Sequence, residues 1–343
     1  MRITDRPCRV YAAASFVRSQ LSLAAMFIFT AVCMFLLGYL LDDTEENAPT
    51  TQEKHWALVW HDEFNGTEVD LQKWSFEYNC YGGGNNEQQC YTDRKENAFI
   101  AEGLLHIVAR QEPFSGPAHK DDHRDYLRTD LSVTKPFTSA RMRTLYKGDW
   151  LYGRFEVRAK LPSGQGSWAA AWMLPSDSCY GEWSSSGELD IVEAVNLGTL
   201  LNKDTGAKET RVHGTLHYGQ SWPNNVYSGF SYQLPNNQSP ADNFHVYAIE
   251  WQQDEIRWYV DGVHYATQTS KTWYSKYVAG SDLIEAKDGA PFDKRFHLLL
   301  NLAVGGDWAE NVNDKGIDKR AFPQTFLIDY VRVYQSIASN DRQ

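Results

Sequence analysis

The chain has 343 residues, a formal net charge of −11 and an aromatic content of 14%. A chain of this length buries one large core or two modest ones, and we expect one domain with additional segments. The negative charge, without a cluster of Lys or Arg in the body, argues against nucleic acid or an anionic polymer as partner and favours a neutral one. Twelve Trp and nineteen Tyr exceed the needs of such a core, so part of them is available for ligand contacts.

An apolar run without charges extends from Leu21 to Leu41. Four arginines precede it and four carboxylates follow at residues 42–46, which predicts an N-terminus inside the cell. The run is long enough to cross a bilayer as a helix and does not end in an Ala-x-Ala cleavage site. We therefore expect a signal anchor, with a cleaved signal peptide as the alternative, and in both cases an exported body. Residues 42–54 are acidic and polar, as in a flexible linker.

Two loops stand out in the first part of the body. Cys80 and Cys90 flank the glycine-rich loop Tyr81–Glu87. An oxidising compartment would allow these cysteines to form a disulfide, and free thiols are the alternative. The loop itself is typical of a tight turn at the rim of a cleft. A second loop, over residues 112–130, contains two prolines and is predicted to be a mobile surface loop.

Strand patterns recur from Trp56 onward, with turn residues between them. The segment Arg154–Leu161 alternates between charged and apolar residues, which predicts a half-buried antiparallel strand. Residues 246–265 predict two strands, and Asp261-Gly262 is a hairpin signal. Further strands are predicted at residues 104–109, 296–304 and 326–334. No sustained helical period follows residue 41, so the pattern indicates an all-β sandwich or barrel.

Three carboxylates interrupt an apolar stretch at residues 187–193, Gly-Glu-Leu-Asp-Ile-Val-Glu. Charges on a buried strand are costly to desolvate, so we expect them to share a site that pushes their pKa values apart. Strand alternation places Glu188 and Asp190 on one face and Glu193 on the other. A one-residue bulge after Asp190 would return Glu193 to the first face. Two carboxyls about 5 Å apart cleave glycosidic bonds with retention. The alternative is an edge strand whose acids face solvent.

Further motifs lie before and after this stretch along the chain. They are Trp60–Gly66, Asn85–Glu87, Tyr152–Arg154, Trp168 with Trp172–Pro175, Gly187–Glu193, Asn301–Gly306, Phe322–Gln324 and Asp329–Tyr334. Through these motifs the chain, over about residues 56–334, resembles glycoside hydrolase family 16, in particular its laminarinase-like endo-β-1,3-glucanases. The two residues between Asp190 and Glu193 are similar to the bulged version of the family's catalytic strand.

The resemblance implies a fold and a set of catalytic roles. The expected fold is all-β, a β-jelly-roll sandwich of two curved antiparallel sheets with a concave substrate cleft, preceded by the N-terminal hydrophobic helix. Glu188 would be the nucleophile, and Glu193 the acid that protonates the leaving oxygen and later activates water. Asp190 would tune both. The resemblance implies no cofactor for catalysis.

Six further residues match substrate-binding positions of the family: Asn86, Arg141, Trp168, Trp172, His217 and Trp308. The resemblance implies that Trp168 and Trp172 stack on sugar rings on the non-reducing side, where Asn86 and Arg141 reach hydroxyl groups. His217 matches a cleft histidine, for which a core histidine is the alternative. Trp308 either lines the cleft or packs at its rim.

The resemblance also implies a possible structural Ca²⁺ away from the cleft. Glu63, Gly103 and Asp329 are the matching positions, and oxygen ligands of this kind suit a hard cation. Only one of the ligands would be a side chain.

Together these observations predict a retaining endo-glycosidase that hydrolyses laminarin-type β-1,3-glucan. The alternatives are a transglycosylase, a glucan-binding recognition protein of the same fold, or a hydrolase of another glucan or galactan. We expect an N-terminal segment at 1–41, a linker at 42–54, a catalytic domain at 55–336 and a tail at 337–343. The expected partner is a polysaccharide or oligosaccharide substrate. The membrane is a second partner if the anchor is uncleaved. We expect no nucleic acid partner, a monomer, and a catalytic domain outside the cytoplasm, anchored or secreted.

Overall fold

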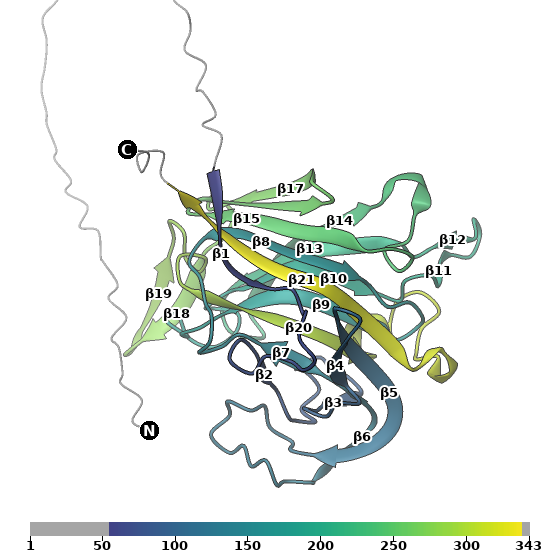
Figure 1. The fold of residues 1–343 in the computed structure, drawn as a ribbon. Coiled ribbons are helices and arrows are strands. Elements are labelled where there is room, and N and C mark those ends of the chain that lie inside the picture. Colours follow the sequence, from purple (N-terminus) through teal and green to yellow (C-terminus); the bar gives the residue numbers. More distant parts are fainter. Residues whose placement is uncertain (1–54, 338–343) are drawn as a thin grey trace, which may run out of the picture. The chain divides into compact units, whose positions relative to one another are not determined.

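The computed structural model describes residues 55–337, and most of the ordered secondary structure in this range is β-strand (Figure 1). Two large sheets pack against each other, a ten-stranded sheet A and a nine-stranded sheet B. The all-β prediction is therefore confirmed, and the arrangement agrees with a jelly roll. The predicted segments at 1–41 and 42–54 lie outside the described residues. No helix within residues 55–337 is long and apolar enough to cross a membrane.

Sheet A contains the strands β1 (His55–Asp62), β3 (Gln89–Tyr91), β4 (Ala98–Ala101), β5 (Leu104–Gly116), β6 (Val133–Ser139), β8 (Gly153–Lys160), β15 (His245–Gln252), β16 (Glu255–Val260), β17 (Val263–Thr269) and β21 (Gln324–Ile337). Their order is β17-β16-β15-β8-β21-β5-β6-β3, with β1 paired to β21 and β4 to β5. The last strand of the chain thus lies between β8 and β5, so the fold closes only when the C-terminal strand is in place.

Sheet B contains the strands β2 (Ser75–Phe76), β7 (Arg141–Arg143), β9 (Ser167–Pro175), β10 (Glu188–Val195), β13 (Arg211–Gly219), β14 (Asn225–Gln233), β18 (Ser275–Ala279), β19 (Asp282–Ala286) and β20 (Phe296–Val304). Their order is β19-β18-β13-β10-β9-β20-β7-β2, with β14 paired to β13. Smaller elements are the pair β11 (Leu200–Asn202) and β12 (Ala207–Lys208), the helix α1 (Gly306–Ala309) and the 3₁₀ turns η1 (Pro235–Asn237) and η2 (Lys319–Ala321).

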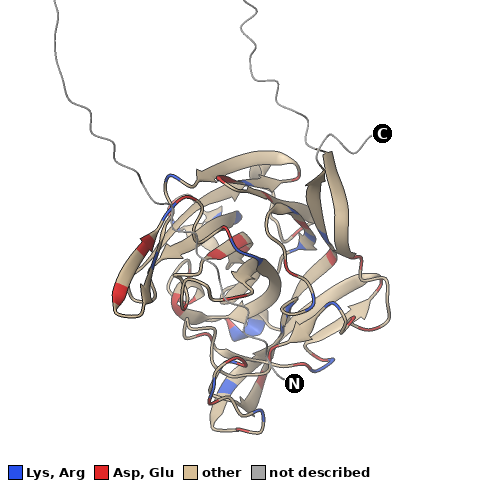
Figure 2. Ribbon diagram, turned by 90° about the vertical axis from the view of Figure 1, so that its left-hand side faces the viewer, with Lys and Arg blue, Asp and Glu red and all other residues tan. Residues whose placement is uncertain are grey.

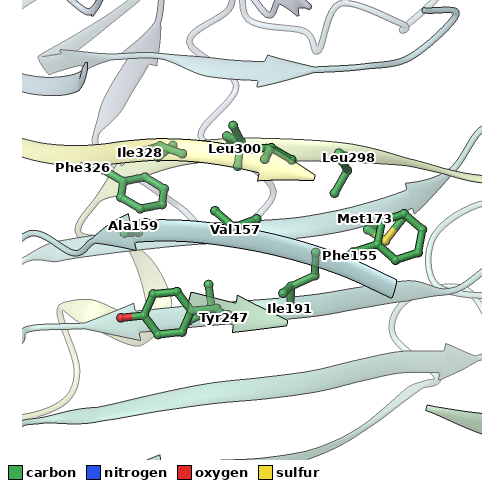
Figure 3. Close-up of a cluster of buried hydrophobic side chains, with 14 of the residues drawn as sticks. Phe155, Val157, Ala159, Met173, Ile191, Tyr247, Leu298, Leu300, Phe326 and Ile328 are labelled. Carbon is green, nitrogen blue, oxygen red and sulfur yellow. The ribbon is translucent and has the colours of Figure 1, made fainter. Parts of the chain in front are cut away.

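The core lies between the two sheets. On β8 the apolar residues Phe155, Val157 and Ala159 are fully buried while the charged residues between them are partly exposed, as the alternating pattern predicts. Figure 3 shows these side chains with others from both sheets, among them Ile191 of β10. Each large apolar side chain buried in this way contributes about 1.5–3 kcal/mol. The inward face of sheet B therefore packs in the core, so a functional site on this sheet can lie only on its outward face.

Two strand predictions need correction. Residues 246–265 were expected to form two strands, and they contribute to three, β15, β16 and β17. An additional reversal occurs at Gln253-Asp254, where polar residues replace the apolar ones, and the hairpin signal Asp261-Gly262 joins β16 to β17.

The predicted loop at 112–130 begins later than expected, because β5 continues to Gly116 and pairs with β6. Pro113 is accommodated where the register of this pair shifts, since a bulge does not require its missing N–H. The remainder of the loop is fastened to the body. Asp121 accepts hydrogen bonds from the main-chain N of Tyr78 at 3.0 Å and from Asn79 Nδ2 at 2.7 Å.

The bulge predicted in the acidic strand is present. The register of β10 shifts between Asp190 and Val192 against β9, and between Asp190 and Glu193 against β13. Ile191 and Val192 are consecutive, yet both are buried in the core. The extra inward residue restores Glu193 to the face that carries Glu188 and Asp190.

A tryptophan of sheet A binds the main chain at this bulge from the core side. Trp258 of β16 is fully buried, and its Nε1 donates a hydrogen bond of 2.8 Å to the main-chain O of Asp190. Gly214 of β13 makes room for the indole, because a Cβ there would lie 2.3 Å from Trp258 Cδ1 and 2.6 Å from the Tyr265 hydroxyl. The position of the acidic strand therefore depends on a contact between the two sheets.

We predict that Trp258→Phe loosens the bulge selectively. The substitution removes the side-chain donor to a buried carbonyl, which costs about 1–3 kcal/mol. Trp251→Phe is the matched control, because Trp251 is also fully buried and donates from Nε1 to a main-chain carbonyl, that of Phe292, at 3.1 Å. Both variants should lower the urea midpoint, and only Trp258→Phe should speed amide hydrogen exchange of residues 191–194. Equal exchange in the two variants would contradict the assigned role.

Candidate active site

The three predicted acids lie together on the outward face of sheet B. In the register with β13, Glu188 is opposite His217, Asp190 is opposite Thr215 and Glu193 is opposite His213. On the other side, β9 places Trp172 beside Asp190 and Ala170 beside Glu193. Glu193 thus has a small residue on its β9 side and an imidazole on its β13 side.

Glu188 is held by two side chains. Trp183, from the segment before β10, donates from Nε1 to Glu188 Oε2 at 2.7 Å. His217 Nε2 lies 3.6 Å from Glu188 Oε1 and 3.5 Å from Asp190 Oδ2. One imidazole therefore lies within ion-pair distance of both carboxylates.

The carboxylates and the imidazole shift one another's pKa values. Burial and the neighbouring Asp190 raise the pKa of Glu188 to about 7, and burial raises the pKa of Asp190 although His217 opposes it. Burial alone would lower the pKa of His217, but Glu188 and Asp190 outweigh it and raise that pKa to about 9. An imidazolium between the two acids thus favours their ionised forms.

Glu193 has a different environment. Its Oε1 accepts a hydrogen bond of 3.0 Å from Trp168 Nε1. Burial, followed by the charge of Asp190, raises the pKa of Glu193 well above its ordinary value. Carboxyls with separate environments on one face can act as a proton donor and as an ionised nucleophile.

An aromatic cluster supports the Glu193 end of the strand. The ring of Trp168 packs edge-to-face on Trp308 of α1 at 5.3 Å, and Trp308 packs on His213 at 5.1 Å. Burial and the nearby Arg211 lower the pKa of His213 to about 4. This neutral ring adds no positive charge beside Glu193, which helps that carboxyl keep its proton.

Trp172 is fixed by a chain of hydrogen bonds. Its Nε1 donates to Asn301 Oδ1 at 2.7 Å, Asn301 Nδ2 donates to the Tyr91 hydroxyl at 3.1 Å, and that hydroxyl donates to Glu87 Oε2 at 3.2 Å. The guanidinium of Arg141 lies 4.6 Å from the ring centroid of Trp172, a cation–π distance. The indole is therefore held rigidly on the side of β9, β20 and β7.

Arg141 is largely buried. Its Nε lies 3.2 Å from Glu77 Oε1, and the exposed fraction of its side chain is 13%. Such pairing orients the guanidinium and limits how much of it can reach a ligand.

The glycine-rich loop closes onto α1. A disulfide joins Cys80 to Cys90 across it, so of the two alternatives in the sequence the structure has the bridge. Asn86 is exposed and donates from Nδ2 to Asp307 at 3.0 Å. Gly83 has a φ of 61°, and a Cβ there would lie 2.1 Å from Glu87 Oε1, so only glycine fits. Asn86 thus lies next to the helix that carries Trp308.

Two residues of this site were missed in the sequence. Trp183 lies in a stretch rich in Ser and Gly, where no periodicity indicates a side-chain direction. Asn301 did carry a signal, because it is a polar residue within the apolar strand Phe296–Val304 and is 6% exposed. Buried polar groups are almost always hydrogen-bonded, so a partner such as Trp172 could have been sought.

Two of the three predicted calcium positions carry a carboxylate that pairs with an arginine. Both oxygens of Glu63 accept hydrogen bonds of 2.8 Å from Arg332, and Asp329 pairs with Arg158. Arg158 pairs with the expected side-chain ligand Asp329, whereas Glu63 and Gly103 were expected to contribute main-chain oxygens, so the calcium site stays a prediction. Within residues 55–337 the side chains with metal-ligand spacing are Glu188, Asp190 and His217, within 4.8 Å of one another.

Known protein sequences resemble this chain over most of its length. The sequence model of Glycosyl hydrolases family 16 matches residues 111–318. The beta-glucanase of Rhodothermus marinus is 38% identical over 319 residues, which cover 88% of this chain and 93% of that protein. The glucan endo-1,3-beta-glucosidase A1 of Niallia circulans is 38% identical over 81% of this chain, which spans only 38% of that longer protein. The beta-1,3-glucan-binding protein of Penaeus monodon is 32% identical over 80% of this chain and 81% of its own length.

Solved structures show the same likeness in three dimensions. The laminarinase from Rhodothermus marinus superposes with a TM-score of 0.65 at 38% identity, over 84% of this chain and all of that one. The endo-beta-1,3-glucanase from Pyrococcus furiosus superposes with a TM-score of 0.65 at 32% identity, over 84% of this chain and 97% of that one.

One assignment follows from three findings. The strand β10 is bulged and carries three acids, the family's sequence model matches, and solved structures of relatives share the fold. The chain belongs to glycoside hydrolase family 16, and it is a hydrolase similar to the endo-β-1,3-glucanases of that family.

Proposed function

We propose that the protein hydrolyses β-1,3-glucan within the chain, with retention at the anomeric carbon. The observation that carries this proposal is the placement of Glu188 and Glu193 on one face of one bulged strand, in different environments. Glu188 lies beside the imidazolium of His217 and is the nucleophile. Glu193 is kept protonated by burial and by Asp190 and is the acid.

In the first step, Glu188 attacks the anomeric carbon, and the bond to the leaving oxygen breaks as Glu193 gives that oxygen its proton. The product is a glycosyl-enzyme. In the second step, the ionised Glu193 takes a proton from water, the oxygen of water bonds to the same carbon, and the Glu188 carboxylate departs. The two displacements use only carboxylates and water, so the reaction needs no cofactor.

Asp190 and His217 distribute the charge between these steps. Asp190 lies between the two glutamates on the same face, and its charge raises the pKa of both. When Glu188 gives up its negative charge to the glycosyl bond, His217 still balances Asp190. The proposed task of Asp190 is therefore to keep the acid protonated without competing with the nucleophile for the sugar.

A neutral glucan is the substrate that the surroundings support best. Figure 2 shows segments with Lys and Arg dispersed among those with Asp and Glu, without a continuous band of one sign, whereas a sulfated polymer requires a basic surface. We propose that Trp168, Trp172 and Arg141 bind the sugars on the non-reducing side, with Asn86 and Trp308 at the rim. Relatives named as 1,3-glucanases support the linkage.

The relative from Penaeus monodon is named as a glucan-binding protein, which makes recognition without catalysis the second candidate. Both glutamates and their partners are in place here, and this favours catalysis. We further propose an exported, monomeric catalytic domain, either anchored by residues 21–41 or secreted. The Cys80–Cys90 disulfide supports an oxidising compartment.

We predict that Glu188→Gln abolishes hydrolysis and leaves binding intact. Without the nucleophile, kcat on laminarin should fall by at least about a thousandfold, while laminari-oligosaccharides still bind in calorimetry. The control is Glu182→Gln, an exposed residue of the loop before β10. Incubation of the wild type with laminarin, lichenan, agarose and carrageenan, followed by chromatography, gives the specificity, and NMR of the first products gives the anomer. Unchanged turnover in Glu188→Gln would refute the mechanism.

Asp190→Asn should move the pH profile toward lower pH. The negative charge of Asp190 raises the pKa of both Glu188 and Glu193, so its removal lowers both. The acidic limb, where Glu188 must lose its proton, and the alkaline limb, where Glu193 must keep its own, therefore shift in the same direction. The profile of kcat/KM measures this, with Glu182→Gln as control. A shift to higher pH would show that the carboxylate does not act through its charge.

A further inference from the structure

The direction of the substrate across sheet B follows from the placement of the acids. Glu188 and Glu193 lie on the same strand, so the bond to be cleaved must lie between two points of β10. A polymer that passes between them crosses the strands rather than following one. It then has β9, β20 and β7 on one side of β10, and β13 and β14 on the other.

The outward face of β14 can be identified from its contacts. The Ser228 hydroxyl donates a hydrogen bond to Gln268 Oε1 of β17, and Tyr232 packs on Tyr265 of β17, with ring centroids 5.1 Å apart. Ser228, Phe230 and Tyr232 therefore share the face toward sheet A. By alternation, Tyr227 and Gly229 face outward, the same way as the catalytic acids.

Three aromatic side chains lie exposed on this side of the catalytic strand, and we call Trp183, Trp222 and Tyr227 the β14-side platform. Tyr227 is in register with His217, with ring centroids 5.9 Å apart, and is 71% exposed. Trp222, in the turn between β13 and β14, is 74% exposed, and its main-chain N donates to the Trp183 carbonyl at 3.4 Å. Trp183 is 38% exposed and binds Glu188.

A row of short residues across three strands connects the acids with this platform. Asp190, Thr215 and Gly229 stand in one row across β10, β13 and β14. A side chain at position 229 would lie 2.8 Å from Thr215 Oγ1, so glycine keeps the row flat. Two strand spacings separate β14 from β10, about 10 Å in all, which places the platform next to the first sugars beyond the cleaved bond.

The two sides of β10 differ in how firmly their aromatic rings are held. Trp172 is locked by Asn301 and Arg141, whereas Trp222 and Tyr227 are mostly exposed. A retaining enzyme must hold one half of the substrate through the covalent intermediate and exchange the other half. The firmly held rings on the β9 side suit the part of the substrate that stays bound to the enzyme. The exposed rings on the β14 side suit the part that leaves.

We propose that the β14-side platform binds the reducing-end sugars of the substrate and, after they leave, an acceptor sugar. This inference rests on the proposed function. In transfer, an acceptor hydroxyl loses its proton to Glu193 and its oxygen bonds to the anomeric carbon, while the bond from that carbon to Glu188 breaks. Stacking on Trp222 and Tyr227 raises the local concentration of acceptor relative to water, so the platform sets the ratio of transfer to hydrolysis.

The test measures this ratio with laminarihexaose as donor and isotope-labelled laminaribiose as acceptor. Tyr227→Ala and Trp222→Ala should each lower it about three- to tenfold, the loss of one aromatic contact. Tyr227→Phe retains the ring and should retain the ratio. Phe230→Ala is the matched control, because Phe230 lies on the same strand, is 46% exposed and faces sheet A.

Thermal unfolding of each variant checks that it is folded, and Trp222, in a turn, provides a second variant if Tyr227→Ala unfolds. If the wild type does not cleave laminarihexaose, the proposed function fails. If it cleaves, but Tyr227→Ala and Trp222→Ala keep the ratio of Phe230→Ala, the platform is refuted and the proposed function stands. A drop in total turnover with an unchanged ratio also refutes the platform.

Discussion

The hydrogen bond from Trp258 to the carbonyl of Asp190 joins the packing of this protein to its chemistry. The bulge in β10 is needed to bring Glu193 to the face of Glu188, and it inserts a second consecutive residue into the core. An indole from the opposite sheet supports the strand at that point. Gly214 is part of the same arrangement, because any larger residue would occupy the space of the indole. The spacing of the two glutamates is thus set by contacts beneath the sheet, away from the substrate.

On the outward face of sheet B, desolvation has the largest effect on the pKa values of the acids. Three carboxylates share a buried surface with one histidine between two of them, and burial is the largest cause of each raised carboxyl pKa. Isolated charges could not be kept in such a place. His217 offsets the desolvation penalty at Glu188 and Asp190. At Glu193, His217 and the hydrogen bond from Trp168 also lower the pKa, but burial and the charge of Asp190 outweigh them. The different partners of otherwise similar side chains distinguish Glu193, the proposed acid, from Glu188, the proposed nucleophile.

The site is also asymmetric along the path of the substrate. On the β9 side, a hydrogen-bonded chain runs from Trp172 through Asn301 and Tyr91 to Glu87, in a loop closed by the Cys80–Cys90 disulfide. On the β14 side, Trp222 and Tyr227 are exposed. Rigid binding on one side and easy exchange on the other is a combination that both hydrolysis and transfer require. Under the proposed function, the balance between these outcomes is set at the β14 side of sheet B.

The sequence alone determined the local features of this protein. Alternation along residues 154–161 predicted β8, and the odd spacing of Glu193 predicted the bulge, because side-chain direction in a strand depends only on parity. The tertiary structure decided which groups meet. Asn301 lies far in sequence from Trp172, which it binds, and Trp183 reaches Glu188 from an irregular segment without periodicity. The turn at residues 253–254 between β15 and β16 has only a weak polar signal, and Arg158 of β8 pairs with Asp329. Such contacts depend on the register between strands far apart in the chain, which periodicity within one strand does not contain.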